Sequence, residues 1–257
     1  MTEASTPLAG RYGPGDLSLF TGPERDRFLG PHGVDGMKAL HGDEDAWQRI
    51  EPHLVWELLY RKEPDLYERL IAGERIHPGI LDWLPGRIER CVEVAAGTGR
   101  LTADLQSRCA ELIAVEPAKS LRRMLAAKKE LRKVDVRSGF FDTIPVTDAW
   151  ADVVVSLSSL TRDEWHGGDA GLAEMERVAR GMIVLVWPSD VDWLRDRGFE
   201  YVCFDGDMTV EFRSLQEAVT LAKIFYPHAV EEIASPSVSY DVLGMNAPRD
   251  LAWKRVS

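Results

Sequence analysis

Short apolar runs alternate with amphipathic segments from Arg90 onward, and this alternation limits the fold more than any other feature. Such runs are too apolar to face water on one side, which is typical of a parallel sheet covered by helices on both faces. Five of them read as buried strands, at residues 91–94, 112–115, 134–136, 152–156 and 182–187. The sequence therefore predicts an α/β fold with a doubly wound, mostly parallel sheet.

The C-terminal region adds two more expected strands. Residues 238–245 and 251–256 have strand character and are joined by the short turn 246–249, which favours an antiparallel pair. A helix is expected before them, over 215–225. The prediction is a seven-stranded, Rossmann-like sheet whose last strand is antiparallel.

The first 86 residues differ from the rest in composition and in the spacing of apolar residues. Residues 1–44 are rich in Gly, Pro and small polar residues, which predicts a flexible arm or a lid that orders on a ligand. Helical spacing then begins, and Pro52, Pro64 and Pro78 each stand where a helix can start. We interpret 45–86 as a helical lid segment and 87–257 as the main domain.

Residues 188–213 follow the fifth expected strand and show no clear period. Long loops in compact domains are usually functional. We interpret this segment as a cap over a substrate pocket, with a plain surface insertion as the alternative.

Charge and cysteine content restrict the partners. The chain has 42 acidic and 31 basic residues, a formal charge of −11, which argues against unaided binding of nucleic acid or an anionic membrane. Its three cysteines form no CxxC pair, so neither a disulfide framework nor a zinc site is expected, and no spacing indicates another metal. We find no leader and no apolar run near 18 residues, and we expect a cytoplasmic protein.

A glycine turn follows the first strand directly. Gly97 and Gly99 allow unusual backbone angles and the close approach of a ligand. Glu116 closes the second strand 19 residues after Gly97, where an acid can accept both hydroxyls of a ribose. The residues alone predict a nucleoside site.

The spacing of the glycines in this turn indicates which class of nucleoside ligand the site binds. The third glycine of a dinucleotide fingerprint is absent, and so is a phosphate loop. The pattern from Glu93 to Gly99 instead resembles the first motif of class I S-adenosylmethionine-dependent methyltransferases. Further segments continue the resemblance in order, at 114–117, 139–145, 150–154 and 175–181.

The resemblance implies roles for the cofactor-binding residues. Ala95, Gly97 and Gly99 would meet the methionine end of S-adenosylmethionine. Glu93 would brace the turn or reach the amino group of the cofactor through water. Glu116, followed by Pro117 in the same motif, would hold the ribose.

The remaining roles implied by the family concern the adenine, the methyl group and the carboxylate. Phe140 and Phe141 would flank the adenine, and Asp142 would reach its amino group. The methyl donor would lie beside Ser156 and Leu157, and its carboxylate beneath Tyr67 and Arg75. Two positions depart from the family pattern: Ala95 replaces a glycine, and Phe140 stands where an acid is usual.

Methyl transfer is an in-line displacement that depends mostly on alignment. His166 and Asp163 follow the fourth strand at the carboxyl edge, where His166 could serve as a general base or simply be solvated. We predict transfer to a hydroxyl or amine of a small molecule. A homodimer is one option, and the sequence leaves the oligomeric state open. The alternatives are a catalytically silent S-adenosylmethionine-binding scaffold or sensor, and a nucleotide-dependent oxidoreductase.

Overall fold

The computed structural model describes residues 7–206, 210–233 and 248–256, and the chain divides into two compact units. The helical unit comprises residues 1–73 and 210–243, and the sheet unit comprises 74–209 and 244–257. This division differs from the expected boundary at residue 87. Helix α5 (Pro78–Trp83) belongs to the sheet unit, whereas α10 (Leu215–Phe225) belongs to the helical unit.

The sheet unit contains a seven-stranded sheet in the order β3-β2-β1-β4-β5-β7-β6. Strands β1 to β5 are parallel, and β7 runs antiparallel to both of its neighbours. This topology confirms the predicted doubly wound, mostly parallel sheet. The strands are β1 (Ile88–Val94), β2 (Cys109–Val115), β3 (Asp135–Arg137), β4 (Ala151–Leu157), β5 (Ala179–Val186), β6 (Glu200–Cys203) and β7 (Asp250–Arg255).

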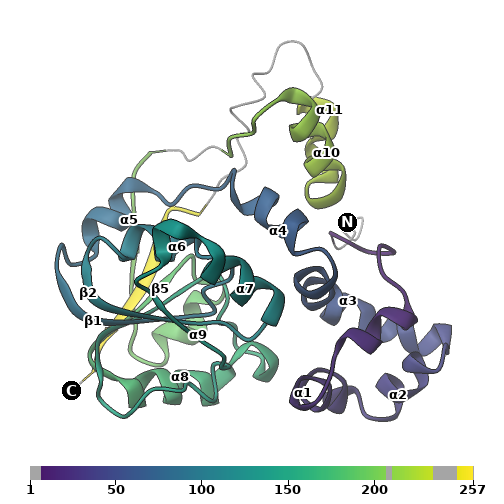
Figure 1. The fold of residues 1–257 in the computed structure, drawn as a ribbon, viewed down its shortest axis with the longest axis horizontal. Coiled ribbons are helices and arrows are strands. Elements are labelled where there is room, and N and C mark those ends of the chain that lie inside the picture. Colours follow the sequence, from purple (N-terminus) through teal and green to yellow (C-terminus); the bar gives the residue numbers. More distant parts are fainter. Residues whose placement is uncertain (1–6, 207–209, 234–247, 257) are drawn as a thin grey trace. The chain divides into compact units, whose positions relative to one another are not determined.

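Helices cover both faces of the sheet (Figure 1). On one face, α5 and α6 (Arg100–Leu105) pack on β1, β2 and β4, and α7 (Lys119–Ala127) packs nearby on β2. The other face is covered by α8 (Gly168–Val178) and α9 (Val191–Arg195). Two 3-10 turns, η3 (Lys129–Leu131) and η4 (Glu164–His166), lie in the connections.

The region that shows no period in the sequence is partly regular. Within 188–213, α9 is followed by β6, a four-residue strand at the edge of the sheet. The strand expected at 251–256 is β7, but the hairpin partner predicted for it is wrong. β7 lies between β5 and β6, and residues 238–245, the expected partner, fall outside the described residues.

The helical unit is built around α3 (Glu44–Lys62). Its other helices are α1 (Pro23–Leu29), α2 (Val34–Leu40), α4 (Pro64–Ile71), α10 and α11 (Val230–Ile233), with the 3-10 turns η1 (Pro14–Leu19), η2 (Gly30–His32) and η5 (Pro227–Ala229). Pro64 and Pro78 begin helices as predicted, but Pro52 does not, because α3 continues through it. The Asp43 carboxylate caps α3 by accepting the Ala46 N–H, so the helix starts eight residues before Pro52.

The described part of the N-terminal segment is packed, unlike the flexible arm that its composition predicts. Leu17, Phe20 and Phe28 are each no more than 2% exposed. Arg11 and Tyr12 both donate hydrogen bonds to the carboxylate of Glu63, at the end of α3. Short helices need neither long periodicity nor high helix propensity when side chains on a long neighbour fix them.

Arg61, on α3, is the central link in this packing. Its guanidinium lies over the rings of Phe20 and Phe28, at 4.7 and 4.9 Å from their centroids. It also pairs with Glu57 at 2.6 Å and with Glu24 at 3.2 Å, and its side chain is 7% exposed. One buried cation therefore joins η1 and α1 to α3. Across the described residues, no helix has the length and apolarity needed to cross a membrane.

We expect Arg61→Ala to lower the free energy of unfolding of the helical unit by about 3 kcal/mol, because two carboxylates lose their ion pair with Arg61 and two rings lose the cation. The matched control is Arg49→Ala, also on α3, whose pair with Asp35 is exposed on both sides. It should change the stability little. Urea unfolding followed by tryptophan fluorescence measures both, and equal effects would contradict the assigned role of Arg61.

Candidate functional site

Three central strands end in strained backbone at one edge of the sheet. Ala95 follows β1 with φ 59°, Ser158 follows β4 with φ 50°, and Trp187 follows β5 with φ 55°. Residues other than glycine seldom adopt this left-handed backbone region. Strained backbone of this kind is more frequent at functional sites. We call the residues that directly follow β1, β2, β4 and β5 the carboxyl edge.

The turn after β1 requires its glycines. Gly97 has φ 59° and Gly99 has φ 98°. A Cβ added to Gly99 would lie 2.8 Å from Leu131 Cδ1, so a side chain here would also have to displace the end of Leu131. The turn is closed by a hydrogen bond of 2.9 Å from the Gly99 N–H to the Ala96 carbonyl. Its backbone is therefore fixed before any ligand binds.

Glu116 connects this turn to the second strand. Its side chain accepts the Gly97 N–H at 2.8 Å through Oε2 and the Ala118 N–H at 2.7 Å through Oε1. The residue is 4% exposed. Each carboxylate oxygen has a second lone pair. The group can thus hold the turn and still accept hydroxyl donors from a ligand.

Glu93, on β1, is even more deeply buried, at 1% exposure. It accepts a hydrogen bond of 2.6 Å from Thr102 Oγ1 on α6. Burial raises the pKa of Glu93 to about 8, although the Thr102 hydrogen bond acts in the opposite direction. At pH 7 this carboxyl is therefore mostly neutral, which suits a brace between β1 and α6.

Buried polar atoms without a hydrogen-bond partner gather at the same edge. Considering the described residues alone, they include Thr98 Oγ1, Arg100 Nε, Ser156 Oγ and Trp187 Nε1. Buried polar groups in proteins are normally paired, so such a group marks the place of a water or a ligand. Thr98 and Trp187 were not among the predicted site residues, and no sequence pattern reveals their burial or the backbone angle of Trp187.

The predicted adenine neighbours separate into two environments. Phe141 is 8% exposed and packs in the core on the α8 face of the sheet, whereas Phe140 is half-buried. Asp142 is also half-buried and accepts a hydrogen bond of 3.2 Å from Thr143 Oγ1. Of the two rings, Phe140 is the more accessible.

The other predicted cofactor residues are divided between the units. Pro117, Ser156 and Leu157 lie in the sheet unit at or beside the carboxyl edge, and the latter two are buried. Arg75 also lies in the sheet unit and is exposed. Tyr67 belongs to the helical unit, where its ring meets that of Tyr60 edge-on at 4.9 Å.

His166 and Asp163 form a side-chain pair after β4. Asp163 accepts the backbone N–H groups of Trp165 and His166 at 3.0 Å, and His166 Nδ1 lies 3.1 Å from Asp163 Oδ1. Burial opposes ionisation of Asp163, but hydrogen bonds from Thr161 and His166 and the charge of His166 outweigh it and lower its pKa. A carboxylate facing Nδ1 favours the tautomer in which Nε2 carries the lone pair.

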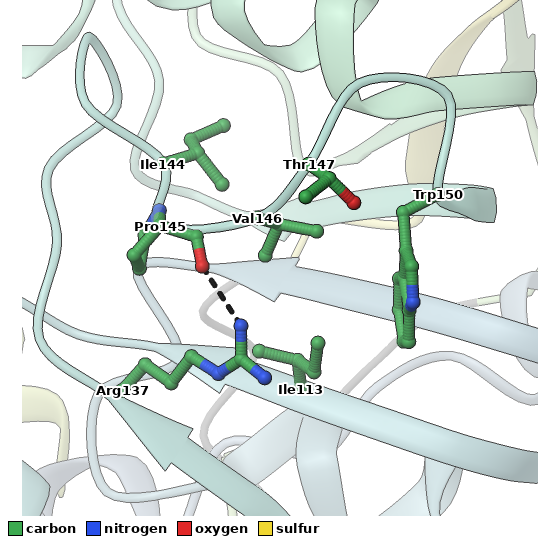
Figure 2. Close-up of a pocket in the computed structure, with 7 residues that line it drawn as sticks. All are labelled: Ile113, Arg137, Ile144, Pro145, Val146, Thr147 and Trp150. Atoms are coloured by element: carbon green, nitrogen blue, oxygen red, sulfur yellow. Dashed lines mark hydrogen bonds between the residues drawn. The ribbon is translucent and has the colours of Figure 1, made fainter.

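A cavity of about 530 Å³ lies elsewhere in the sheet unit (Figure 2). Apolar side chains that include Ile113, Val146 and Trp150 line it, and none of the predicted site residues does. Its one charged lining residue, Arg137, already donates to the Pro145 carbonyl at 2.8 Å and to Asp135. We therefore place the candidate site at the carboxyl edge rather than here.

The described part of the chain contains no cluster of three or more His, Cys, Asp or Glu side chains that could hold a metal ion.

The carboxyl edge itself has the features of a nucleoside-binding α/β domain. These are a tight glycine turn, a buried acid directly after the next strand and, among the described residues, buried polar atoms without a hydrogen-bond partner between them.

Comparison with known proteins agrees with this class. Residues 92–184 match the family model of the methyltransferase domain. Together with the strand order, this match confirms the resemblance to class I S-adenosylmethionine-dependent methyltransferases.

Curated relatives include uncharacterized methyltransferases of Mycobacterium bovis and Mycobacterium tuberculosis. Each is 32% identical over 151 residues, which cover 56% of this chain and 59% of the relative. The chain thus spans less than two thirds of the length of these relatives. Among solved structures, magnesium protoporphyrin IX methyltransferase from Synechocystis, with S-adenosylmethionine bound, is 13% identical at a TM-score of 0.46, covering 63% of this chain and 90% of that one.

The raised pKa of Glu93 predicts a pH-dependent stability. Between its ordinary value of 4.5 and about 8, the folded chain holds a proton that the unfolded chain loses. The stabilisation is therefore fully present below pH 4.5 and is lost as pH rises through 8, at about 1.4 kcal/mol for each unit of pKa difference.

We expect Glu93→Gln to remove this part of the pH dependence. Urea unfolding at half-unit steps from pH 5 to 9 measures it, with Glu111→Gln as the control, because Glu111 lies exposed on the neighbouring strand β2. Parallel pH profiles for the parent and Glu93→Gln would show that Glu93 is ionised in the folded protein.

Proposed function

We propose that the sheet unit binds S-adenosylmethionine at the carboxyl edge and directs its methyl group to a hydroxyl or amine of a small molecule. The observation that carries this proposal is the buried Glu116 carboxylate, held by the Gly97 and Ala118 N–H groups. The bound cofactor supplies an activated methyl group on a sulfonium and its own leaving group. The protein's task is then to position the two reactants.

The residues present fit this cofactor. Glu116 offers lone pairs to the ribose hydroxyls, and the glycine turn lets the backbone approach the methionine end. The unpaired Ser156 hydroxyl at the end of β4 supports a polar contact near the methyl donor. Phe140 is the ring that we assign to the adenine, with Asp142 beside it.

His166 is the residue that we propose as general base, with Asp163 as the group that orients it. The Asp163 carboxylate at Nδ1 leaves Nε2 to take the acceptor's proton, the arrangement that histidine bases require. A base is needed for a hydroxyl or a protonated amine. The formal charge of −11 favours a small acceptor over a nucleic acid.

A binding protein without transfer activity remains the second candidate. Its support was the replacement of a glycine by Ala95 and of an acid by Phe140. Ala95 nevertheless adopts the left-handed φ of 59° that the turn requires. This replacement has not prevented the turn from forming, which weakens the argument for a silent scaffold.

Glu116→Gln should weaken the binding of S-adenosylhomocysteine, the demethylated product, by at least 10-fold, because hydrogen bonds to a charged carboxylate contribute about 1.5–3 kcal/mol each. Isothermal titration calorimetry measures the affinity. The control is Glu111→Gln on β2, the strand that Glu116 directly follows, and this variant should bind like the parent. If the parent gave no binding heat, or if Glu116→Gln bound as tightly as the parent, the proposed cofactor site would be wrong.

His166→Gln should slow methyl transfer about 100-fold while leaving the affinity for S-adenosylhomocysteine unchanged, because proton removal contributes roughly 10²–10⁴-fold. The assay uses methyl-labelled cofactor with a panel of phenols, alcohols and amines. An unchanged rate in His166→Gln would exclude it as the base.

A further inference from the structure

The ring of Trp187 packs on the face of the sheet opposite to the one that strand alternation predicts. Along β5, Ile183 and Leu185 belong to the core on the α8 face, whereas Val184 and Val186 belong to the core on the α6 face. Strict alternation would place Trp187 with Leu185. Its left-handed φ of 55° instead puts the ring in the same core as Val186, where it is 6% exposed.

On this face the indole meets Arg100, the first residue of α6. The guanidinium carbon lies 4.7 Å from the centroid of the ring. Arg100 also forms an ion pair with Glu74 through Nη1, and both side chains are largely buried. The backbone strain at Trp187 therefore serves to bring an aromatic ring against a partly buried ion pair just after the glycine turn.

Two hydrogen-bond donors in this cluster have no acceptor among the described residues. They are the indole Nε1 of Trp187 and the Nε of Arg100, and both atoms are buried. Leaving a buried donor unpaired costs about 1–3 kcal/mol, and more when the group is charged. Two adjacent donors of this kind match an oxygen-rich acceptor, because one carboxylate can receive both.

The charge of the cluster limits which kind of ligand can bind there. Glu74 already balances Arg100, so a ligand with net negative charge would introduce an unpaired charge into a buried site. A zwitterion avoids this cost, since its carboxylate can face the two donors while its ammonium group leaves the ligand neutral overall. The amino-acid end of S-adenosylmethionine has this charge pattern.

We propose that Trp187 Nε1 and Arg100 Nε receive the carboxylate of the amino-acid end of the methyl donor. This inference rests on the proposed function and names residues other than Tyr67 and Arg75 for that contact. Arg75 is exposed, whereas both donors of this pair are buried beside the glycine turn.

The test compares two nucleosides that differ in the amino-acid end. S-adenosylhomocysteine carries it and 5′-methylthioadenosine lacks it. Trp187→Phe keeps an aromatic ring for Arg100 and removes the N–H donor together with part of the ring volume, which the Trp253→Phe control also removes. We expect its affinity for S-adenosylhomocysteine, measured by calorimetry, to fall about 10-fold, since hydrogen bonds to charged groups are among the stronger ones. The affinity for 5′-methylthioadenosine should stay within about twofold.

The control is Trp253→Phe, on β7, whose half-buried ring packs on Trp83 in the same core, at 5.5 Å between centroids. It should bind both nucleosides like the parent. Arg100→Lys provides a second test if Trp187→Phe unfolds, because it keeps a cation near Glu74 and loses the Nε donor. It should show the same selective loss.

Unchanged binding of S-adenosylhomocysteine by both variants would overturn the inference, and so would an equal loss for the two nucleosides. A parent that bound both nucleosides equally well would also overturn it, while leaving the nucleoside site intact. If the parent bound neither, the proposed function itself would fail.

Discussion

The hydrogen bonds from Gly97 and Ala118 to Glu116 organise the edge of the sheet on which the rest depends. One carboxylate joins the turn after β1 to the first residues beyond β2. Burying such a group is costly unless donors surround it, and here two backbone N–H groups provide them. Because the backbone supplies these donors, side-chain motion cannot remove them. The acceptor that we assign to the ribose is therefore fixed in position before the proposed nucleoside binds.

Two buried acids on adjacent strands have different surroundings and, we infer, different roles. Glu116 lies among backbone donors at the edge, whereas Glu93 is enclosed beneath it with one hydroxyl partner, and burial raises its pKa to about 8. A mostly neutral Glu93 is a poor partner for an ammonium group. Of its two expected roles, this favours the brace between β1 and α6.

The sequence predicted what depends on local pattern. Buried parallel strands are apolar throughout, so β1, β2, β4 and β5 were readable. The spacing from Gly97 to Glu116 follows from the combined length of α6 and β2 with their connections. β6 was missed because a four-residue edge strand has no periodicity of its own. The packing of the N-terminal segment depends on the contacts of Arg61 with Phe20, Glu24 and Phe28, which lie far away in sequence. Pro52 was misread because the cap at Asp43 sets the start of α3.

Strain and unpaired donors at the carboxyl edge have a common physical explanation. A left-handed tryptophan costs roughly 1–3 kcal/mol and persists only where its surroundings require it. The core around Val186 and the stacked Arg100 hold the Trp187 ring in place, yet they leave its N–H without an acceptor. Packing alone gives the indole N–H no role. In the proposed complex, in contrast, the indole nitrogen gains an acceptor, so the inferred contact gives a role to a donor that packing leaves unpaired.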